Sequence, residues 1–263
     1  MIKTVSSANN ETLKMIRSLS RKKGRIKNNA YFAEGVRIVD DALKSANIRM
    51  VVASDVYAEK NPDFVKSVDK IVKNVYITDE KIFRELCMTE NPQGIGAVID
   101  IPSDSEVNFD GMNYVLILDS VSEPGNMGTI IRTAEAAGIE RIFLTDGCAD
   151  IYNPKTVRAA MGSLVRMKFS HCDDETVRRL HDVGFKIVAT ALYNSVSIEN
   201  VDIHGKRALV IGNEAHGVSD KIIGLSDFSV RIDMCGRVES LNAAVAAGIS
   251  MYMLRPKQGE INA

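Results

Sequence analysis

Tyr114-Val115-Leu116-Ile117-Leu118 is a continuous apolar run, and a polar turn joins it to Glu123-Pro124-Gly125-Asn126-Met127-Gly128. A strand that is apolar at every position is typical of a parallel sheet covered on both faces. Similar strands are predicted at 141–144, 186–189 and 208–211, with helical segments between them. This alternation indicates an α/β fold with a parallel sheet in the C-terminal part of the chain.

The segment after the first strand predicts a helix from Asn126 to Ala137, with Asn126 as its N-cap. Its apolar residues fall on one stripe at helical spacing and are expected to face the core: Met127, Ile130, Ile131 and Ala134. Arg132 lies off this stripe and is expected to point toward solvent or a cleft. An exposed arginine on a helix is most often a solvated charge, but this turn lies where α/β sheets bind ligands.

A second loop, Gly212-Asn213-Glu214-Ala215-His216-Gly217, also follows an apolar strand directly. Its two glycines are spaced as in a phosphate-binding loop, but Val218 stands where that loop needs lysine, which argues against a nucleotide triphosphate site. What remains is a close backbone approach permitted by glycine and one carboxylate, Glu214. His216 has no partner in the sequence pattern, and we assign it no role.

A third loop, 232–242, leads into an apolar helix predicted from Ser240 to Leu254, with Ser240 as its cap. The helix is apolar on nearly every side, so we expect it to be buried. Asn242 opens this helix, and a buried amide needs a hydrogen-bond partner. That partner is either a nearby backbone carbonyl or a polar group of one of the other two loops.

The first hundred residues predict a separate small α/β unit. Short strands are predicted at 31–33, 50–53, 75–77 and 94–99, and helices at 11–20, 34–43 and 78–86. The polar, turn-rich stretch that follows is the predicted linker. The predicted domains are therefore 1–100, a linker at 101–112, and 113–263.

Charge is concentrated at the N-terminal end. The chain carries a net charge of −1, but residues 1–37 hold nine basic and two acidic side chains, a net charge of +7. Such an asymmetry indicates a polyanionic partner, although a solvated helix face gives the same pattern. We expect phosphate contacts from eight of these cations: Lys14, Arg17, Arg21, Lys22, Lys23, Arg25, Lys27 and Arg37.

Composition excludes several other classes. The 263 residues are 45% hydrophobic and 25% charged, as in ordinary globular proteins. The longest uncharged apolar stretch, Ala243 to Leu254, is shorter than the roughly 20 residues that span a membrane. The four cysteines form no C-x-x-C pair, so we expect reduced thiols and no metal site. The first residues lack a secretory signal, and we expect a cytoplasmic protein.

Taken together, the three loops resemble the SpoU (TrmH) family of RNA ribose 2′-O-methyltransferases over about 113–258. The resemblance is carried by Asn126-x-Gly128-x-x-x-Arg132-Thr133-Ala134, Gly212-Asn213-Glu214-x-x-Gly217 and Ser240-Leu241-Asn242. Residues 1–100 resemble the small substrate-binding domain of members that act on ribosomal RNA. That likeness rests on Phe32-x-Glu34-Gly35-x-Arg37 and Asn91-Pro92-Gln93-Gly94.

The resemblance implies a deep trefoil knot in the C-terminal domain, a topology that ordinary folding rules exclude. It also implies a homodimer and S-adenosylmethionine as the methyl donor. The family's cofactor contacts carry over to Thr190, Gly212, Ile232, Met234 and Leu241. Asp233 departs from the family pattern, which has proline there, and losing that fixed φ angle is expected to affect cofactor affinity.

For catalysis, the resemblance assigns the ribose hydroxyl to Arg132, with Asn126, Glu214, Ser240 and Asn242 arranging the site. Two roles for Arg132 stay open. It is either the general base or a cation that stabilises the developing alkoxide, since a free guanidinium loses its proton only above pH ~12. The alternatives to a ribosomal RNA enzyme are a transfer RNA 2′-O-methyltransferase, a non-catalytic RNA-binding member of this fold, and a related knotted enzyme that methylates a base.

Overall fold

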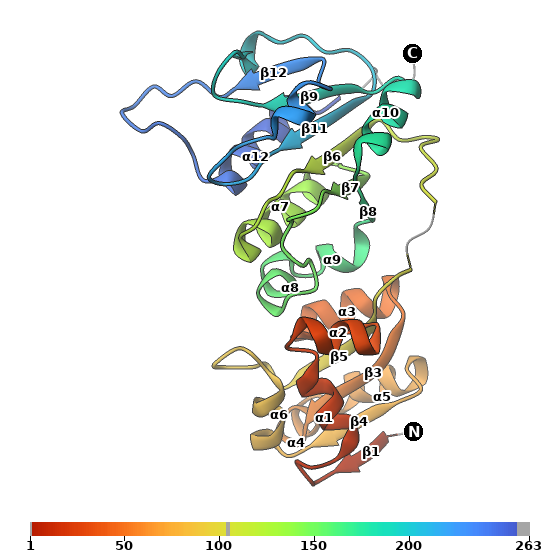
Figure 1. Ribbon diagram of the computed structural model, residues 1–263. Helices are drawn as coiled ribbons and strands as arrows, with labels where there is room; N and C mark the ends of the chain where they lie inside the picture. Colours follow the sequence, from red (N-terminus) through yellow and green to blue (C-terminus); the bar gives the residue numbers. More distant parts are fainter. Residues whose placement is uncertain (1, 104–105, 257–263) are drawn as a thin grey trace. The chain divides into compact units, whose positions relative to one another are not determined.

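The computed structural model describes residues 2–103 and 106–256, which fold into two compact units (Figure 1). Of the described residues, the first unit comprises 2–103 with 150–166, and the second comprises 106–149 with 167–256. Residues 150–166, which the sequence-based division assigned to the C-terminal domain, therefore pack with the first unit. The division of the sequence at 101–112 stays a prediction.

The first unit contains a mixed five-stranded sheet in the described part of the chain. Its strand order is β1 (Ile2–Val5), β4 (Val75–Thr78), β3 (Ile48–Ser54), β5 (Ile95–Asp100) and β2 (Ala30–Glu34). β1, β4 and β3 pair in parallel, whereas β5 runs antiparallel to both β3 and β2. One side of its core is built from apolar residues of the sheet and of two helices, among them Leu13, Val52, Phe83 and Val98.

Several helices of the first unit begin at a residue whose side chain caps them. Asn10, Ser54 and Asp79 each accept a hydrogen bond from a backbone N–H of the helix that follows. The helices are α1 (Glu11–Ser18), α2 (Lys22–Asn28), α3 (Val36–Ser45), α4 (Asp55–Lys60), α5 (Pro62–Ile71), α6 (Glu80–Leu86), α8 (Pro154–Ala160) and α9 (Ser163–Arg166). The sequence pattern predicts no helix over the basic stretch Lys22–Asn28, which forms α2.

The second unit contains a parallel sheet, and this confirms the predicted fold class. Its strand order is β10 (Val196–Ser197), β12 (Phe228–Arg231), β9 (Lys186–Thr190), β11 (Arg207–Ile211), β6 (Tyr114–Leu118), β7 (Arg141–Leu144) and β8 (Phe169–His171). Every neighbouring pair is parallel. The central strands β6 and β11 are buried at every residue, as expected for a sheet covered on both faces.

Helices cover this sheet: α7 (Pro124–Ala136), α10 (Asp174–Asp182), α11 (Asp220–Ile223) and α12 (Ala243–Met253), with a short 3-10 turn at Ile198–Asn200. α7 and α12 pack side by side (Figure 1). The predicted apolar stripe of α7 is buried, and Arg132 is exposed. Two capping predictions are wrong. Glu123 occupies the N-cap position of α7, so Asn126 lies in the first turn, and Asn242 rather than Ser240 caps α12.

The expectation that the last helix is buried is also wrong. Val245, Tyr252 and Met253 are 51%, 45% and 44% exposed, so α12 buries one side and leaves an apolar side open. Within 2–103 and 106–256, no helix is long and apolar enough to cross a membrane. The trefoil knot stays a prediction.

Candidate active site

The three loops singled out in the sequence follow strands that are close together in one parallel sheet. β6 pairs with β11 so that Leu118 lies opposite Ile211, and β9 lies between β11 and β12. In a parallel sheet, the carboxyl ends of all strands meet at one edge. The first loop after β6, the second after β11 and the third after β12 therefore share that edge (Figure 1).

The carboxylate of Glu214 is the centre of a hydrogen-bond network that joins the first two loops. It accepts hydrogen bonds from the backbone N–H groups of Ser122 and Glu123, both at 3.1 Å, and from the Ser122 hydroxyl at 3.1 Å. The Asn126 side-chain amide donates a further bond at 3.0 Å. One carboxylate thus fixes the turn that opens α7.

Asn126 extends the network to the third loop. Its side-chain oxygen accepts a hydrogen bond from the Asn242 amide at 3.0 Å. The oxygen of Asn242 in turn accepts from the backbone N–H groups of Ala244 and Val245, which open α12. The sequence leaves two possible partners for Asn242, a nearby backbone carbonyl or a polar group of another loop. The structure shows the second, the side chain of Asn126 in the first loop.

These contacts set the protonation state of Glu214. Partial burial on its own raises the pKa of the carboxyl, but the hydrogen bonds from Asn126 and from the Ser122 and Glu123 backbone outweigh it and lower the pKa to about 2. Glu214 is therefore a carboxylate at neutral pH and binds protons too weakly to serve as a general base there.

The second loop is held in a tight turn. Asn213 and Gly217 exchange backbone hydrogen bonds, both 2.9 Å long. A Cβ atom at Gly212 would lie 2.0 Å from the carbonyl carbon of Gly217, so only glycine fits at this position. The Asn213 amide donates to the Ser120 carbonyl at 2.8 Å, and Ser120 has a positive φ of 58°. The loop thus holds a strained residue of the first loop in place.

Asp119 and Asn213 also hold the loops at this edge of the sheet, and the sequence pattern did not single them out. Asp119 is 5% exposed and accepts hydrogen bonds from the Ser219 backbone at 2.7 Å and the Thr145 hydroxyl at 3.0 Å. The sequence offered a signal for Asp119, because it is an acidic residue that ends an apolar strand directly. Asn213 lies in the motif Gly212-Asn213-Glu214, but the pattern alone indicates no role for its side chain.

The structure does not bring Arg132 and Ser240 into this network. Both are exposed. Among the described residues, none forms a hydrogen bond or an ion pair with the side chain of either one. Arg132 projects from α7, the helix whose first turn carries Asn126, so its guanidinium is available to a ligand.

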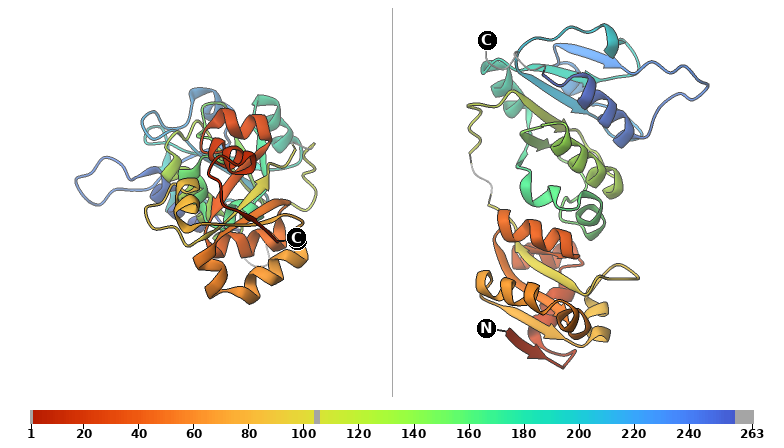
Figure 2. Two further views of the ribbon diagram at one scale, coloured as in Figure 1. Left: turned by 90° about the horizontal axis from the view of Figure 1, so that it is seen from below. Right: turned by 180° about the vertical axis from the view of Figure 1, so that it is seen from behind.

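Three of the residues expected to contact a cofactor directly follow or end strands at the same edge of the sheet. Thr190 ends β9 and donates a hydrogen bond to the Val210 carbonyl at 3.0 Å, Gly212 follows β11, and Ile232 follows β12. Met234 and Leu241 lie in the loop that joins β12 to α12, which extends away from the sheet (Figure 2). Asp233, which replaces the family's proline, accepts a hydrogen bond from Arg231 at 2.8 Å.

A ligand held through backbone groups needs peptide groups that are free, and this loop offers them. Within the described part of the chain, the backbone N–H groups of residues 233–241 donate no hydrogen bond to protein. They lie beside apolar side chains that are only half-buried, including Ile232 and Leu241. Free peptide groups next to apolar surface are suited to a nucleoside, whose base has both a polar edge and an apolar face.

The eight basic residues predicted to contact phosphate differ in their surroundings. Arg25 is 3% exposed, and its guanidinium donates to the Asp150 carboxylate and to the Leu19 carbonyl, so the phosphate contact predicted for it is wrong. Arg17 bonds to the Ala8 carbonyl and to Glu85, and Lys14 pairs with Glu11. The remaining five are exposed to solvent: Arg21, Lys22, Lys23, Lys27 and Arg37.

In the part of the chain that the structure describes, no group of three or more His, Cys, Asp or Glu side chains is arranged to hold a metal ion. The described cysteines form no disulfide.

Comparisons with known proteins agree with this geometry. The SpoU rRNA Methylase family matches residues 113–252, and the MRM3-like substrate binding domain matches residues 10–97. The 23S rRNA (guanosine(2553)-2'-O)-methyltransferase RlmP of Bacillus subtilis is 35% identical over 97% of this chain and 100% of its own length.

Solved structures resemble the whole chain as well. An AdoMet-bound rRNA methyltransferase from Sinorhizobium meliloti matches with a TM-score of 0.86 and 30% identity, over 96% of this chain and 97% of the other. The SpoU methyltransferase AviRb from Streptomyces viridochromogenes, in complex with AdoMet, matches with a TM-score of 0.81 and 25% identity, over 93% and 97% of the two chains.

Proposed function

The chain belongs to the SpoU rRNA methylase family, and we propose that it transfers a methyl group from S-adenosylmethionine to a ribose 2′-hydroxyl of ribosomal RNA. The observation that carries the proposal is the network from Glu214 through Asn126 to Asn242, which joins all three motif loops in one polar site. Because the Bacillus subtilis relative is a guanosine 2′-O-methyltransferase of 23S rRNA, a guanosine of that RNA is the first substrate to test.

The methyl donor supplies an electrophilic methyl group when it is bound. Thr190, Gly212, Ile232, Met234 and Leu241 are the residues that would hold it, through the free backbone groups of 233–241 and the apolar surface beside them. The turn around Gly212 is already held by the paired hydrogen bonds of Asn213 and Gly217, which reduces the ordering that binding requires there. The ion pair of Arg231 and Asp233 fixes the start of this loop where proline would otherwise do so.

Arg132 acts on the ribose hydroxyl in this proposal. Its exposed guanidinium has donors for an oxygen that gains negative charge as the methyl transfers. Glu214, with its lowered pKa, positions Asn126 and does not take the proton. Asn242 orients Asn126 from the other side, and Ser240 lies in the same loop as Asn242. The proton passes to Arg132 itself or to water or a phosphate of the substrate.

The exposed cations of the first unit bind the RNA backbone. Arg21, Lys22, Lys23 and Lys27 lie in or next to α2, and Arg37 lies in α3. Binding through phosphates weakens steeply with salt concentration, because condensed counterions are released. A 2′-hydroxyl target selects RNA over DNA, and an unpaired nucleotide is the accessible form.

We also propose that the protein is a homodimer and acts in the cytoplasm, where ribosomal RNA is assembled into ribosomes. The open side of α12 supports pairing, since Val245, Tyr252 and Met253 form an apolar surface that a second copy would cover. Sedimentation of the purified protein as a monomer at micromolar concentration would contradict the homodimer.

The decisive experiment is methyl transfer from labelled S-adenosylmethionine to ribosomal and transfer RNA that lack the modification. We expect label in ribosomal RNA, at a dinucleotide that resists alkali because its 2′-oxygen is blocked. Label in a base after digestion to nucleosides, or in transfer RNA alone, would refute the proposal in favour of the corresponding enzyme. No label in any RNA, together with RNA binding, would indicate a non-catalytic member of the family.

A further inference from the structure

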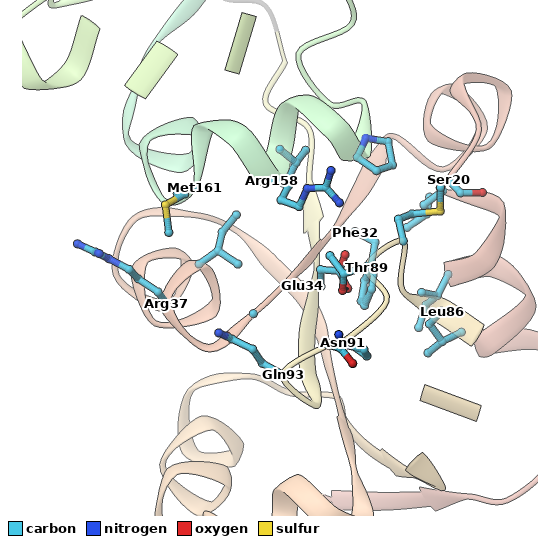
Figure 3. Close-up of a pocket in the computed structure, with 18 residues that line it drawn as sticks. Ser20, Phe32, Glu34, Arg37, Leu86, Thr89, Asn91, Gln93, Arg158 and Met161 are labelled. Carbon is cyan, nitrogen blue, oxygen red and sulfur yellow. The ribbon is translucent and has the colours of Figure 1, made fainter. Parts of the chain in front are cut away.

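The first unit contains a cavity of about 260 Å³ that the proposed chemistry does not use (Figure 3). It is lined by residues of α1, β2, α3, α8 and the loop that joins α6 to β5. All of these elements belong to the same compact unit. The volume is slightly below the roughly 300–1,000 Å³ of pockets for drug-sized ligands, which fits a single nucleobase better than a larger molecule.

The walls of the cavity suit a flat aromatic ring. Phe32, half-buried in β2, contributes its side chain to one wall, and Leu19, Leu86 and Val157 supply aliphatic surface. Aromatic and aliphatic side chains are the groups on which unpaired bases stack in single-stranded RNA recognition.

A carboxylate provides directional recognition inside the cavity. Glu34 lines it, and one of its oxygens accepts a hydrogen bond from the Thr89 hydroxyl at 3.0 Å. The thiol of Cys87 interacts with the same carboxylate, and burial is the main reason that the pKa of this thiol is raised. A carboxylate accepts hydrogen bonds and cannot donate them, so it favours a base edge with N–H groups. Guanine presents two such groups side by side.

Two arginines lie at the cavity and have no partner in the described part of the chain. Arg37 in α3 and Arg158 in α8 both line it, and both are exposed. Figure 3 shows Arg158 reaching from α8 toward the cavity above Glu34. Guanidinium groups bind phosphate in a bidentate manner, so arginines beside a base-sized cavity can bind the backbone on either side of the base.

We infer that this cavity takes one unpaired guanosine of the RNA substrate, with its base against Phe32, its N–H edge on Glu34 and its flanking phosphates on Arg37 and Arg158. The inference rests on the proposed function only in taking RNA as the substrate. The site is separate from the residues assigned to methyl transfer, and it determines which RNA the protein selects.

The test uses the full-length protein labelled with 13C at its methionine methyl groups. Met88 and Met161 line the cavity, so their methyl signals report binding at this site, whereas the Met253 signal serves as an internal control. The probes are the trinucleotides UGU, UAU and UUU, together with guanosine 5′-monophosphate. We expect UGU to shift the Met88 and Met161 signals and to bind about 10-fold more tightly than UAU or UUU.

Variants separate base recognition from phosphate binding. Glu34→Gln is expected to reduce the preference for UGU over UAU about 10-fold, whereas Glu90→Gln, in the same loop but outside the cavity, retains it. Arg158→Ala is expected to weaken all three trinucleotides equally and to reduce the slope of log affinity against log salt concentration by about 0.7. Arg84→Ala, an exposed arginine of α6 away from the cavity, is the matched control.

Several results would overturn the inference: no shift at Met88 and Met161, equal affinity for UGU and UAU, or an unchanged preference in Glu34→Gln. Binding of guanosine 5′-monophosphate as tight as that of UGU would identify a free-nucleotide site and also overturn it. Methyl transfer to ribosomal RNA by the wild-type protein is measured in parallel. Transfer without selective trinucleotide binding refutes this site alone, and selective binding without transfer refutes the proposed function alone.

Discussion

Arg25 in α2 and Arg132 in α7 are both helical arginines that the sequence predicts to be functional, but their surroundings in the structure are opposite. Arg25 is 3% exposed and its guanidinium is held by Asp150 and by the Leu19 carbonyl. Arg132 is exposed and has no hydrogen-bond partner among the described residues. A buried charge requires a partner inside the protein, whereas an exposed one is free to bind a ligand.

The comparison shows that a cluster of cations in a sequence can contain both cations that are buried in ion pairs and cations that are exposed and able to bind a ligand. Lys22 and Lys23 are exposed in the same helix that buries Arg25. The residue that would have distinguished Arg25 is Asp150, which lies 125 positions away along the chain. Charge composition therefore predicts a binding surface but not which residues form it.

Arg132→Ala should produce the largest effect. We expect methyl transfer to fall by at least about 1,000-fold, because the group that faces the ribose oxygen is lost. The melting temperature should stay within 1–2 °C of the wild type's, roughly the effect of a neutral surface substitution. Single-turnover assays and thermal unfolding measure both quantities. If the variant transferred the methyl group at the wild-type rate, both roles considered for Arg132 would be excluded.

Arg25→Ala should give the reverse result. Removing one member of a buried ion pair costs about 3 kcal/mol of unfolding free energy, because Asp150 loses its partner. Denaturant titration measures this loss. RNA affinity at a temperature where the variant remains folded should match the wild type's. A variant that is as stable as the wild type but binds RNA more weakly would instead support the phosphate contact that the sequence predicts for Arg25.

Glu214→Gln should have a smaller effect on stability, and one that depends on pH. The folded pKa of about 2 lies below the ordinary value of 4.5, so the carboxylate stabilises the fold above pH 4.5, and this contribution is lost as the pH falls through 2. The stability difference between wild type and variant should be constant from pH 5 to 8, at about 1 kcal/mol or less because the group is exposed. It should shrink below pH 4.5. A difference that does not change with pH would contradict the lowered pKa.

Lys22→Ala and Lys23→Ala should have the smallest effects. Each is expected to leave stability unchanged and to reduce the salt slope of RNA binding by about 1, as for the loss of one phosphate contact. Filter binding at several salt concentrations measures the slope. Lys66→Ala, an exposed lysine of α5, is the control and should leave the slope unchanged.

The sequence was sufficient where a local pattern determines the structure. The run 114–118 is a buried strand, and the stripe of Met127, Ile130, Ile131 and Ala134 is the buried side of α7. The three motif loops share one sheet edge because parallel strands place them there. Asn242 has a hydrogen-bond partner in the first loop, as expected, but it is exposed, so the premise that its amide is buried is wrong.

Predictions failed where the outcome depends on distant residues. β8, β10 and β12 are two to four residues long, include polar residues, and are defined by their neighbours in the sheet. Both Ser240 and Asn242 are good caps, and the contact with Asn126 accompanies the use of Asn242. The hydrophobic sequence of α12 indicates that its surface must be buried, but it does not indicate which molecule buries it. The sequence of 150–166 contains no signal of its contacts with the first unit, and the division of the chain at 101–112 stays a prediction.

The direction of the hydrogen bonds around Asn126 has a consequence for proton movement. The backbone of α12 donates to Asn242, Asn242 donates to Asn126, and Asn126 donates to Glu214. Amide side chains do not exchange protons along such a chain as hydroxyls and water do. The hydrogen bonds between the three loops therefore hold the loops in position but do not transfer protons. The proton that leaves the ribose must depart through solvent, the nucleic acid or the guanidinium.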